Sequence, residues 1–514
     1  MPHAQPGQPG DYDVIIYGAS LAGIMAALRL RLRGYRSLVL EPTGHVGGIV
    51  AGGLVKSDTP NTLAALAGLT HSRFFGGIAA EYGADERADG PRYRFEPKVA
   101  ERVARRLLDE AKSDVLLNER IHGAADVEVR GERIQAVRTS QGWRRAGAFV
   151  DASYEGDLMA AAGVPYAVGR EPASQYDEPL GGFLPDRAYR RQAFRPNTFY
   201  PVRPMPTEAP GDGDAKVQAY NFRGVLDKGP DRIPFEQPDG YDPKLYTYLG
   251  QLLEQRGIAG LSSIVTHTAL LPNDKYQTNQ ALFIGFDLPG ASWDYPDGSW
   301  QRRDEVIAEQ VRWHRGMLYW LANDPSLSES FRKDAAVFGM PSDEFSDSPY
   351  GQGFPHALYI REARRMVGQR VLTQHDLRRP GNTKETPVCC WNYGIDCHIV
   401  QYYAEGDDTI VGEGTVTGTE KNGSVDLYQL PAEVLFPARG GVGNLVVPIC
   451  FSASHVGYLS ARMEPNYGML GEAAGELLAQ SLQTGQAVQD YDYPALAAAL
   501  TEHGSILSLP ELQN

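Results

Sequence analysis

The sequence has few cysteines, and their placement limits the chemistry that they support. Four cysteines occur among 514 residues, at Cys389, Cys390, Cys397 and Cys450. Their spacing fits no zinc or iron–sulfur pattern, and residues 44–80 contain none, which excludes a redox-active disulfide near the start of the chain. We therefore expect reduced cysteines and no bound metal.

Basic charge and long apolar segments are also scarce. The chain has 49 Lys and Arg against 64 Asp and Glu, a net charge of −15. This balance argues against nucleic-acid or anionic-membrane partners, and no apolar run approaches the roughly 20 residues of a membrane helix. Residues 1–11 are polar and rich in Pro and Gly, which predicts a disordered tail rather than a signal peptide. We expect a cytoplasmic protein with a small-molecule partner, and the sequence leaves open whether it forms a homo-oligomer.

The most informative stretch is residues 11–41, DYDVIIYGASLAGIMAALRLRLRGYRSLVLE. A short apolar run at 14–16 is typical of a strand in a parallel sheet. Gly18, Ser20 and Gly23 then form GxSxxG, a variant of the dinucleotide fingerprint. In this interpretation Gly18 makes the turn, Ser20 stands where a second glycine lets the backbone approach a pyrophosphate, and Gly23 lets the helix pack close to the sheet.

The acidic residue that ends this stretch strengthens the interpretation. Glu41 follows the second apolar run at 38–40 and lies 18 residues beyond Gly23. A carboxylate about 20 residues past the motif binds a ribose hydroxyl in such folds. The helix N-terminus would face the phosphates with its unpaired N–H groups. The alternative, a surface turn in a glycine-rich protein, does not explain the strand, helix and acid together.

The next segment, PTGHVGGIVAGGLVKSD, has five glycines within ten residues. Such crowding indicates backbone in close contact with a neighbour or ligand, and the alternative is a mobile surface loop. A Gly-Gly pair at 47–48 after an acidic strand end, followed by GGL-x3-D, resembles the second signature of the glutathione-reductase-type FAD fold. This resemblance favours FAD over NAD.

Later motifs extend the resemblance over most of the chain. Residues 151–171, DASYEGDLMAAAGVPYAVGRE, are similar to a DATYEGDLAAAAGVPYxVGRE pattern of a large family of FAD-dependent oxidoreductases. The motifs AYNFR, LPN, SWDYP, YIREARRMVG, YGIDCH and SASHVGYLSARMEP follow in the family's order, and Cys397 stands for a family serine. The resemblance implies that the strand ending at Asp151 returns to the FAD diphosphate, although Asp157 has the alternative role of a helix cap.

The motifs supply four candidate catalytic residues. His455 and His398 are the candidate bases, and Arg462 and Arg361 are the candidates for orienting a substrate oxygen or carboxylate. We expect Arg361 to lie with two further arginines on one helix that begins near Tyr359. For each candidate the alternative is a structural role, either on a solvated helix face or within a buried network.

The candidate cofactor contacts come from four segments of the chain. They are Gly18, Ser20, Leu21, Ala22, Gly23, Glu41, Pro42, Gly47, Gly48, Ile49, Ala152, Ser153 and Gly471. The resemblance places Gly471 on the last FAD-contacting helix, where glycines and alanines along one face permit a close approach of sheet or ligand.

These features together predict an α/β protein. A Rossmann-like FAD-binding domain, with a parallel sheet and a β-meander, would be formed by residues 12–171 and 431–487. A large inserted α+β substrate domain would span 172–430, and 488–514 would form a C-terminal helix and tail.

The predicted function is that of an FAD-dependent dehydrogenase or oxidase that moves a hydride from a small polar substrate to the flavin. One alternative is an FAD monooxygenase that uses NAD(P)H, although SASH replaces the GD-x2-H element of aromatic hydroxylases. Another is a non-redox isomerase or lyase, or a flavin-binding sensor.

Overall fold

The computed structural model describes residues 12–83, 93–185, 191–193, 202–265, 272–279, 286–417 and 423–509. The predicted tail at 1–11 and the last residues of the predicted C-terminal tail lie outside the described residues. Among the described residues, no helix combines the length and apolar character needed to cross a membrane. All four cysteines are buried, and none forms a disulfide.

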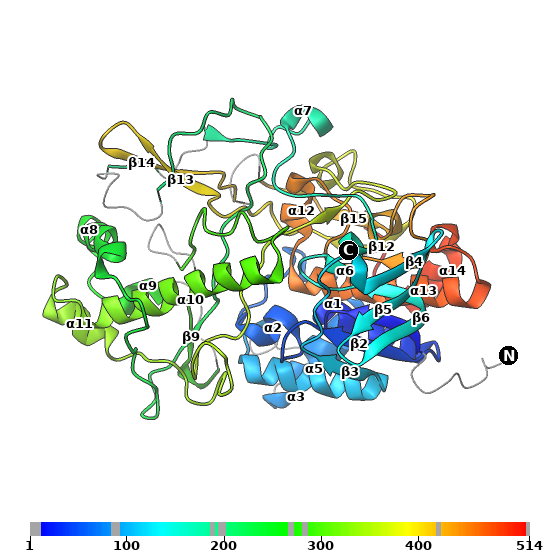
Figure 1. The fold of residues 1–514 in the computed structure, drawn as a ribbon, viewed down its shortest axis with the longest axis horizontal. Helices are drawn as coiled ribbons and strands as arrows, with labels where there is room; N and C mark the ends of the chain where they lie inside the picture. Colours follow the sequence, from blue (N-terminus) through cyan, green and yellow to red (C-terminus); the bar gives the residue numbers. More distant parts are fainter. Residues whose placement is uncertain are drawn as a thin grey trace.

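A seven-stranded sheet forms the first layer of the fold (Figure 1). Its strands are β1 (Tyr12–Tyr17), β2 (Ser37–Glu41), β3 (Asp114–Leu117), β4 (Val127–Arg130), β5 (Arg133–Thr139), β6 (Gly142–Asp151) and β16 (Leu445–Val446). The order is β3-β2-β1-β6-β5-β4, and β16 pairs with β6. β3, β2, β1, β6 and β16 are parallel, whereas β4, β5 and the start of β6 form an antiparallel meander. This arrangement fits the predicted Rossmann-like fold with a β-meander.

Helices cover the sheet, and the ends of the chain meet there. The helices of the first part are α1 (Leu21–Leu32), α2 (Gly48–Gly52), α3 (Gly76–Glu81), α5 (Pro97–Ala111) and α6 (Asp157–Ala161), with a π-helix at Thr70–Phe75. Those of the last part are α12 (His455–Ala461), α13 (Glu464–Thr484) and α14 (Tyr493–Glu502). α1 and α13 pack together, joined by a buried ion pair of 2.9 Å between Arg29 and Glu476. The C-terminal part of the chain therefore packs against the first part.

The last strand of the sheet, β16, is short. Residues 444–449 are all buried, but only Leu445 and Val446 pair with β6. The Asn444 carbonyl accepts from the Phe149 N–H of β6 at 2.8 Å. The Asn444 side-chain amide lies against the meander, where it donates to the Ile134 carbonyl and accepts from the Ile134 N–H. Asn444 therefore joins the start of β16 to both β6 and β5.

The middle of the chain, whose longer helices are green in Figure 1, contains a second hydrophobic core. Its helices are α7 (Ala173–Tyr176), α8 (Thr247–Gln255), α9 (Leu261–Val265), α10 (Trp300–Asn323) and α11 (Glu329–Ala335). Its short strands are β7 (Tyr166–Ala167), β8 (Arg191–Ala193), β9 (Val225–Leu226), β10 (Tyr276–Gln277), β11 (Arg365–Met366), β12 (Pro387–Trp391), β13 (Gln401–Glu405), β14 (Thr409–Glu413) and β15 (Tyr428–Pro431). Isolated 3₁₀ turns connect them. The domain boundaries at 171, 430 and 487 stay predictions.

Candidate functional site

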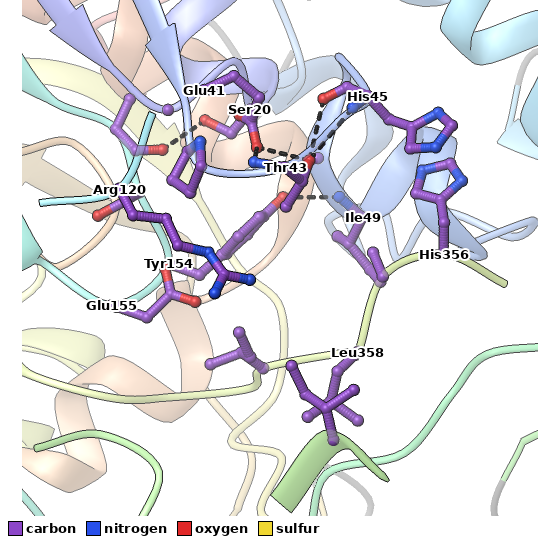
Figure 2. Close-up of a pocket in the computed structure, with 18 of the residues that line it drawn as sticks. Ser20, Glu41, Thr43, His45, Ile49, Arg120, Tyr154, Glu155, His356 and Leu358 are labelled. Carbon is purple, nitrogen blue, oxygen red and sulfur yellow. Dashed lines mark hydrogen bonds between the residues drawn. The ribbon is translucent and has the colours of Figure 1, made fainter. Parts of the chain in front are cut away.

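A cavity opens where β1, β2 and β6 end, at the point where open α/β sheets bind ligands (Figure 2). Eight of the predicted cofactor contacts line it: Gly18, Ser20, Glu41, Pro42, Gly48, Ile49, Ala152 and Ser153. The middle of the chain supplies the opposite wall, with Tyr295, Trp300, Ile307, Tyr350 and residues 356–358 and 360. The cavity therefore lies between the sheet and the middle region.

The turn after β1 shows why Gly18 and Ser20 occur where they do. Gly18 has a φ of +102°, and a Cβ there would lie 2.5 Å from the Ala152 carbonyl oxygen, so only glycine fits. Ser20 has an extended backbone and is the N-cap of α1, where its Oγ accepts from the Gly23 N–H at 3.3 Å. The same hydroxyl donates to the Ala152 carbonyl at 2.7 Å. Ser20 therefore caps the helix and ties it to β6, which differs from the predicted role of a substitute glycine.

Glu41 lies at the end of β2, as predicted, and faces the cavity. Its carboxylate accepts hydrogen bonds from the Ala19 N–H at 2.7 Å, from the Thr43 N–H at 2.9 Å and from the Thr43 hydroxyl at 2.7 Å. Burial raises the pKa of Glu41, and these three donors oppose that effect. The group is held rigidly beside the N-terminus of α1, as a ribose-binding carboxylate requires.

The other predicted contacts lie behind the cavity wall. A Cβ on Gly23 would lie 2.1 Å from the Gly18 carbonyl oxygen, and one on Gly471 would lie 2.2 Å from that of Ala22. Gly471 thus permits close packing of α13 on α1. Gly47 has a φ of +100° and donates its N–H to the Ala19 carbonyl. Leu21 is buried in the first turn of α1. Their contacts with a cofactor stay predictions.

Several lining residues were missed by the sequence interpretation. Arg120 stacks on Trp300 at 4.3 Å and pairs with Asp304 on α10, which joins the sheet to the middle region. His45 and His356 stack with ring centroids 3.7 Å apart (Figure 2). Arg120 comes from a segment without a nucleotide motif, so no sequence signal marks it, whereas His45 and His356 are absent only from the predicted cofactor contacts.

Tyr154 and Glu155, by contrast, stand inside the motif DASYEGD. Their places in that motif could have indicated the cavity. The Tyr154 hydroxyl accepts from the Ile49 N–H at 3.0 Å, as the dashed line in Figure 2 shows. Burial raises the pKa of Glu155 to about 7. Both residues come directly after β6, beside Ala152 and Ser153.

The four predicted catalytic residues meet in one buried polar cluster. Arg361 pairs with Asp287 at 3.0 Å, and Asp287 bonds to His398 Nδ1 at 2.5 Å. His398 Nε2 lies 3.6 Å from Asp396, which pairs with Arg462 at 3.0 Å. The structure therefore brings the predicted residues together, although they are spread over more than 100 positions.

His455 joins this cluster through two side chains. Its Nδ1 lies 2.9 Å from Glu362, and the Glu362 carboxylate accepts from the Gln218 N–H at 3.2 Å. The Gln218 side-chain oxygen accepts in turn from His398 N and from Arg462. Burial opposes ionisation of Glu362, yet the neighbouring His455 lowers its pKa to about 2. His455 Nε2 faces the Cys397 thiol at 4.0 Å.

The segment around Arg361 is extended, so the prediction of one helix with three aligned arginines is wrong. Residues 359–364 form no helix, and β11 begins at Arg365. Arg364 pairs with Asp157 at 2.7 Å, whereas Arg365 pairs with Glu171 at 2.8 Å. The three guanidinium groups therefore pair with three different carboxylates, those of Asp287, Asp157 and Glu171.

The pairing of Arg364 also bears on the alternative role of Asp157. The N-cap of α6 is Gly156, and Asp157 is the first residue of the helix. Its carboxylate bonds to Arg303 and Arg364. Asp157 therefore anchors the sheet to the middle region rather than capping the helix.

The same extended segment separates the cavity from the polar cluster. Leu358 and Ile360 line the cavity, whereas Arg361 belongs to the cluster and its guanidinium lies 4.9 Å from the Tyr359 ring centroid. The alternation follows the two-residue period of extended backbone. A single segment thus forms a wall shared by both.

The cluster contains hydrogen-bonding groups that no described residue satisfies. Both side-chain amide atoms of Asn221, the amide nitrogen of Gln218 and the Nε of Arg462 are buried without a partner among the described residues. Buried polar groups normally have hydrogen-bond partners, so these four atoms are candidates for contacts with a bound ligand. The side chain of Asp396 is 26% exposed, whereas that of its partner Arg462 is 1% exposed.

A cluster of carboxylates outside this region is paired with a buried lysine. Glu96, Asp343 and Glu344 gather their oxygens within 4.8 Å of one another. The Lys275 ammonium lies 2.6, 2.7 and 3.0 Å from them. Lysine thus neutralises this cluster.

The fold and the cavity define a Rossmann-like dinucleotide-binding protein. The residues present fit FAD, because the open N-terminus of α1 suits phosphates and Glu41 suits a ribose. The family model described as FAD dependent oxidoreductase matches residues 13–500. The chain therefore belongs to this family and is an FAD-dependent oxidoreductase. Among curated proteins, none matches the chain.

Solved structures resemble only part of the chain. OxyS anhydrotetracycline hydroxylase from Streptomyces rimosus is 20% identical over 32% of this chain and 36% of its own, with a TM-score of 0.24. L-proline dehydrogenase from P. horikoshii is 16% identical over 32% and 59%, with a TM-score of 0.25. L-amino acid deaminase from Proteus vulgaris is 16% identical over 32% and 54%, with a TM-score of 0.24. The chain spans less than two thirds of each, and at these TM-scores the likeness carries no argument.

Proposed function

We propose that the protein is a dehydrogenase or oxidase that removes a hydride from a small polar substrate, with His455 as the base. The observation that supports this most is the His455–Glu362 pair. Glu362 fixes one ring nitrogen at 2.9 Å, which leaves Nε2 directed to a neutral neighbour. A carboxylate that orients an imidazole in this way is a common arrangement for a general base.

His398 is the weaker candidate for the base. Both of its ring nitrogens face carboxylates, with Asp287 at 2.5 Å and Asp396 at 3.6 Å. Because both ring nitrogens are directed to carboxylates, neither is directed to a position where it could take a proton from a substrate. We assign His398 to binding the substrate through the partly exposed edge that it shares with Asp396.

The two arginines have different proposed roles. Both terminal nitrogens of Arg361 have acceptors, the Ala219 carbonyl and Asp287, so Arg361 positions His398 indirectly. Arg462 binds Asp396 and Gln218 and lies beside the unsatisfied amide of Gln218. We assign Arg462 to orienting an oxygen of the substrate. When bound, FAD supplies the electron acceptor for the hydride.

The middle of the chain is the proposed substrate domain. It has its own hydrophobic core, and it supplies Gln218, Asn221, Asp287, Arg361 and His398 to the cluster. His455 and Arg462 come from the C-terminal part. The proposed active site thus needs both regions.

Anaerobic reduction of the purified yellow protein tests the proposal. Candidate alcohols, amines, amino acids and sugars are added singly, and bleaching of the flavin absorbance is followed. Bleaching by one substrate class, slowed strongly in His455→Asn, is the expected result. Rapid bleaching by NAD(P)H alone would instead favour the monooxygenase. Turnover of a substrate without any bleaching would favour a non-redox role.

A further inference from the structure

Glu464 is a buried acid that the proposed mechanism does not use. It begins α13, and only 3% of its surface is exposed. One carboxyl oxygen, Oε1, bonds to the Tyr154 hydroxyl at 2.7 Å. The other, Oε2, is buried and has no hydrogen-bond partner among the described residues. A single neutral contact leaves this carboxyl group far less satisfied than that of Glu41.

The surroundings of Glu464 contain no compensating cation. No ion pair to its carboxyl group occurs in the part of the chain that the structure describes. The titratable groups that face it are two phenols, Tyr154 from the loop after β6 and Tyr467 from α13 itself. Burial raises the pKa of both phenols well above its usual value, so both are neutral. An ionised carboxylate in such a place is costly, which favours the protonated form.

Tyr154 connects this acid to the cofactor cavity. Its side chain lines the cavity, and its hydroxyl contacts the Ile49 N–H (Figure 2). The same hydroxyl bonds to Glu464 on its other side. A Cβ on Gly48 would lie 2.5 Å from the Tyr154 hydroxyl, so the contact is close. The start of α2 and the loop after β6, which line the cavity, and the start of α13, which lies behind it, converge on this hydroxyl.

We propose that Glu464 is the resident acid of the FAD pocket, and that it holds one proton at neutral pH and acts on the cofactor through the Tyr154 hydroxyl. Glu464 is a positioning residue in this scheme, because Tyr154 lies between it and the cavity. The inference depends on FAD binding and not on which substrate is oxidised.

A neutral acid at this place has a consequence for FAD. The flavin gains electrons on reduction, and a neutral carboxyl group does not repel the added negative charge. Burial raises the pKa of Glu464 to about 8. Above that pH the proton is lost to solvent in the oxidised protein, and reduction is then accompanied by uptake of one proton from solvent at Glu464.

Infrared difference spectroscopy of the holoprotein tests the protonation state. The wild type is expected to lose a carbonyl band of a protonated carboxyl group with a midpoint near pH 8. That band is absent from Glu464→Gln and is retained in the control Glu476→Gln, because Glu476 on the same helix is paired with Arg29. An unchanged band and titration in Glu464→Gln would overturn the proposal.

The midpoint potential of the bound flavin against pH tests the coupling. Wild type and Glu464→Gln are expected to agree at neutral pH and to separate above about pH 8, with the wild type lower. The Tyr154 hydrogen bond lowers the pKa of Glu464, so Tyr154→Phe is expected to move the separation to higher pH. Parallel curves at every pH in all three proteins would show that Glu464 has a structural role only.

Discussion

Replacing Ser20 by Gly or Ala separates two explanations of the GxSxxG motif. If Ser20 only substitutes for a glycine of the fingerprint, then Ser20→Gly restores the usual motif and FAD binds at least as well. The structure indicates the opposite, because the Ser20 hydroxyl accepts from Gly23 N and donates to the Ala152 carbonyl. Its backbone, at φ −66°, gains nothing from glycine.

The expected loss follows from these two bonds. An N-cap replaced by Ala costs about 1 kcal/mol, and by Gly a few tenths. A buried carbonyl that loses its donor costs roughly 1–3 kcal/mol more. We therefore expect both variants to lose about 1–4 kcal/mol of the free energy of unfolding, with Ala at the upper end.

The assay is denaturant unfolding of the FAD-free protein, followed by titration with FAD. The dissociation constant of FAD is expected to rise about tenfold in both variants, because the hydroxyl joins two segments of the cavity wall and tenfold corresponds to about 1.4 kcal/mol. Ser299→Ala is the matched control, since the Ser299 hydroxyl caps α10 through Arg302 N and bonds to no other group among the described residues. Wild-type stability and affinity in Ser20→Gly would refute the reasoning.

Three further predictions concern single side chains. Lys275→Met removes a buried ammonium group that contacts Glu96, Asp343 and Glu344, whereas Lys98 stays beside all three, so urea unfolding is expected to show a loss of about 1–3 kcal/mol, and the exposed Lys333→Met control changes little; a loss as small as that of the control would contradict it. Burial raises the pKa of the Cys397 thiol, so alkylation of the folded protein by iodoacetamide is expected to be slow at neutral pH. The Cys397→Ser variant is expected to keep its flavin. Rapid labelling at Cys397 would contradict this reasoning. In stopped-flow reduction His455→Asn is expected to lower the rate constant of flavin bleaching about 10²–10⁴-fold. His398→Asn is expected mainly to raise the substrate concentration that gives half of the maximal rate. A larger loss of rate in His398→Asn than in His455→Asn would make His398 the base.

The nucleotide half of the fold could be predicted because its signals are local. An apolar strand, a glycine turn and an acid at fixed spacing are all contained in residues 11–41, and β1, α1 and β2 form as expected. The cavity contacts at Gly18, Glu41 and Ala152 follow from the same geometry.

For the polar cluster, the sequence indicates several of the residues that form it but not how they pair. His398, His455, Arg361 and Arg462 stand in recognisable motifs, but their pairing with Asp287 and Glu362 depends on how distant segments pack. The helix expected at 359–368 failed for a related reason. Its arginines each find a different acid, Asp287, Asp157 and Glu171, and these fixed partners hold the chain extended.

The pairing of the first and last helices has a consequence for biosynthesis. Arg29 on α1 pairs with Glu476 on α13, 447 residues later, and Asn444 bonds to Ile134 across 310 residues. Contacts of such long range form slowly, and the chain is made from its N-terminus. The apolar surface of α1 stays without its partner helix until nearly the whole chain has left the ribosome. The packing of α1 is therefore complete only once α13 has been made, and a nascent chain that stalls in the middle region exposes the surface that α13 would cover.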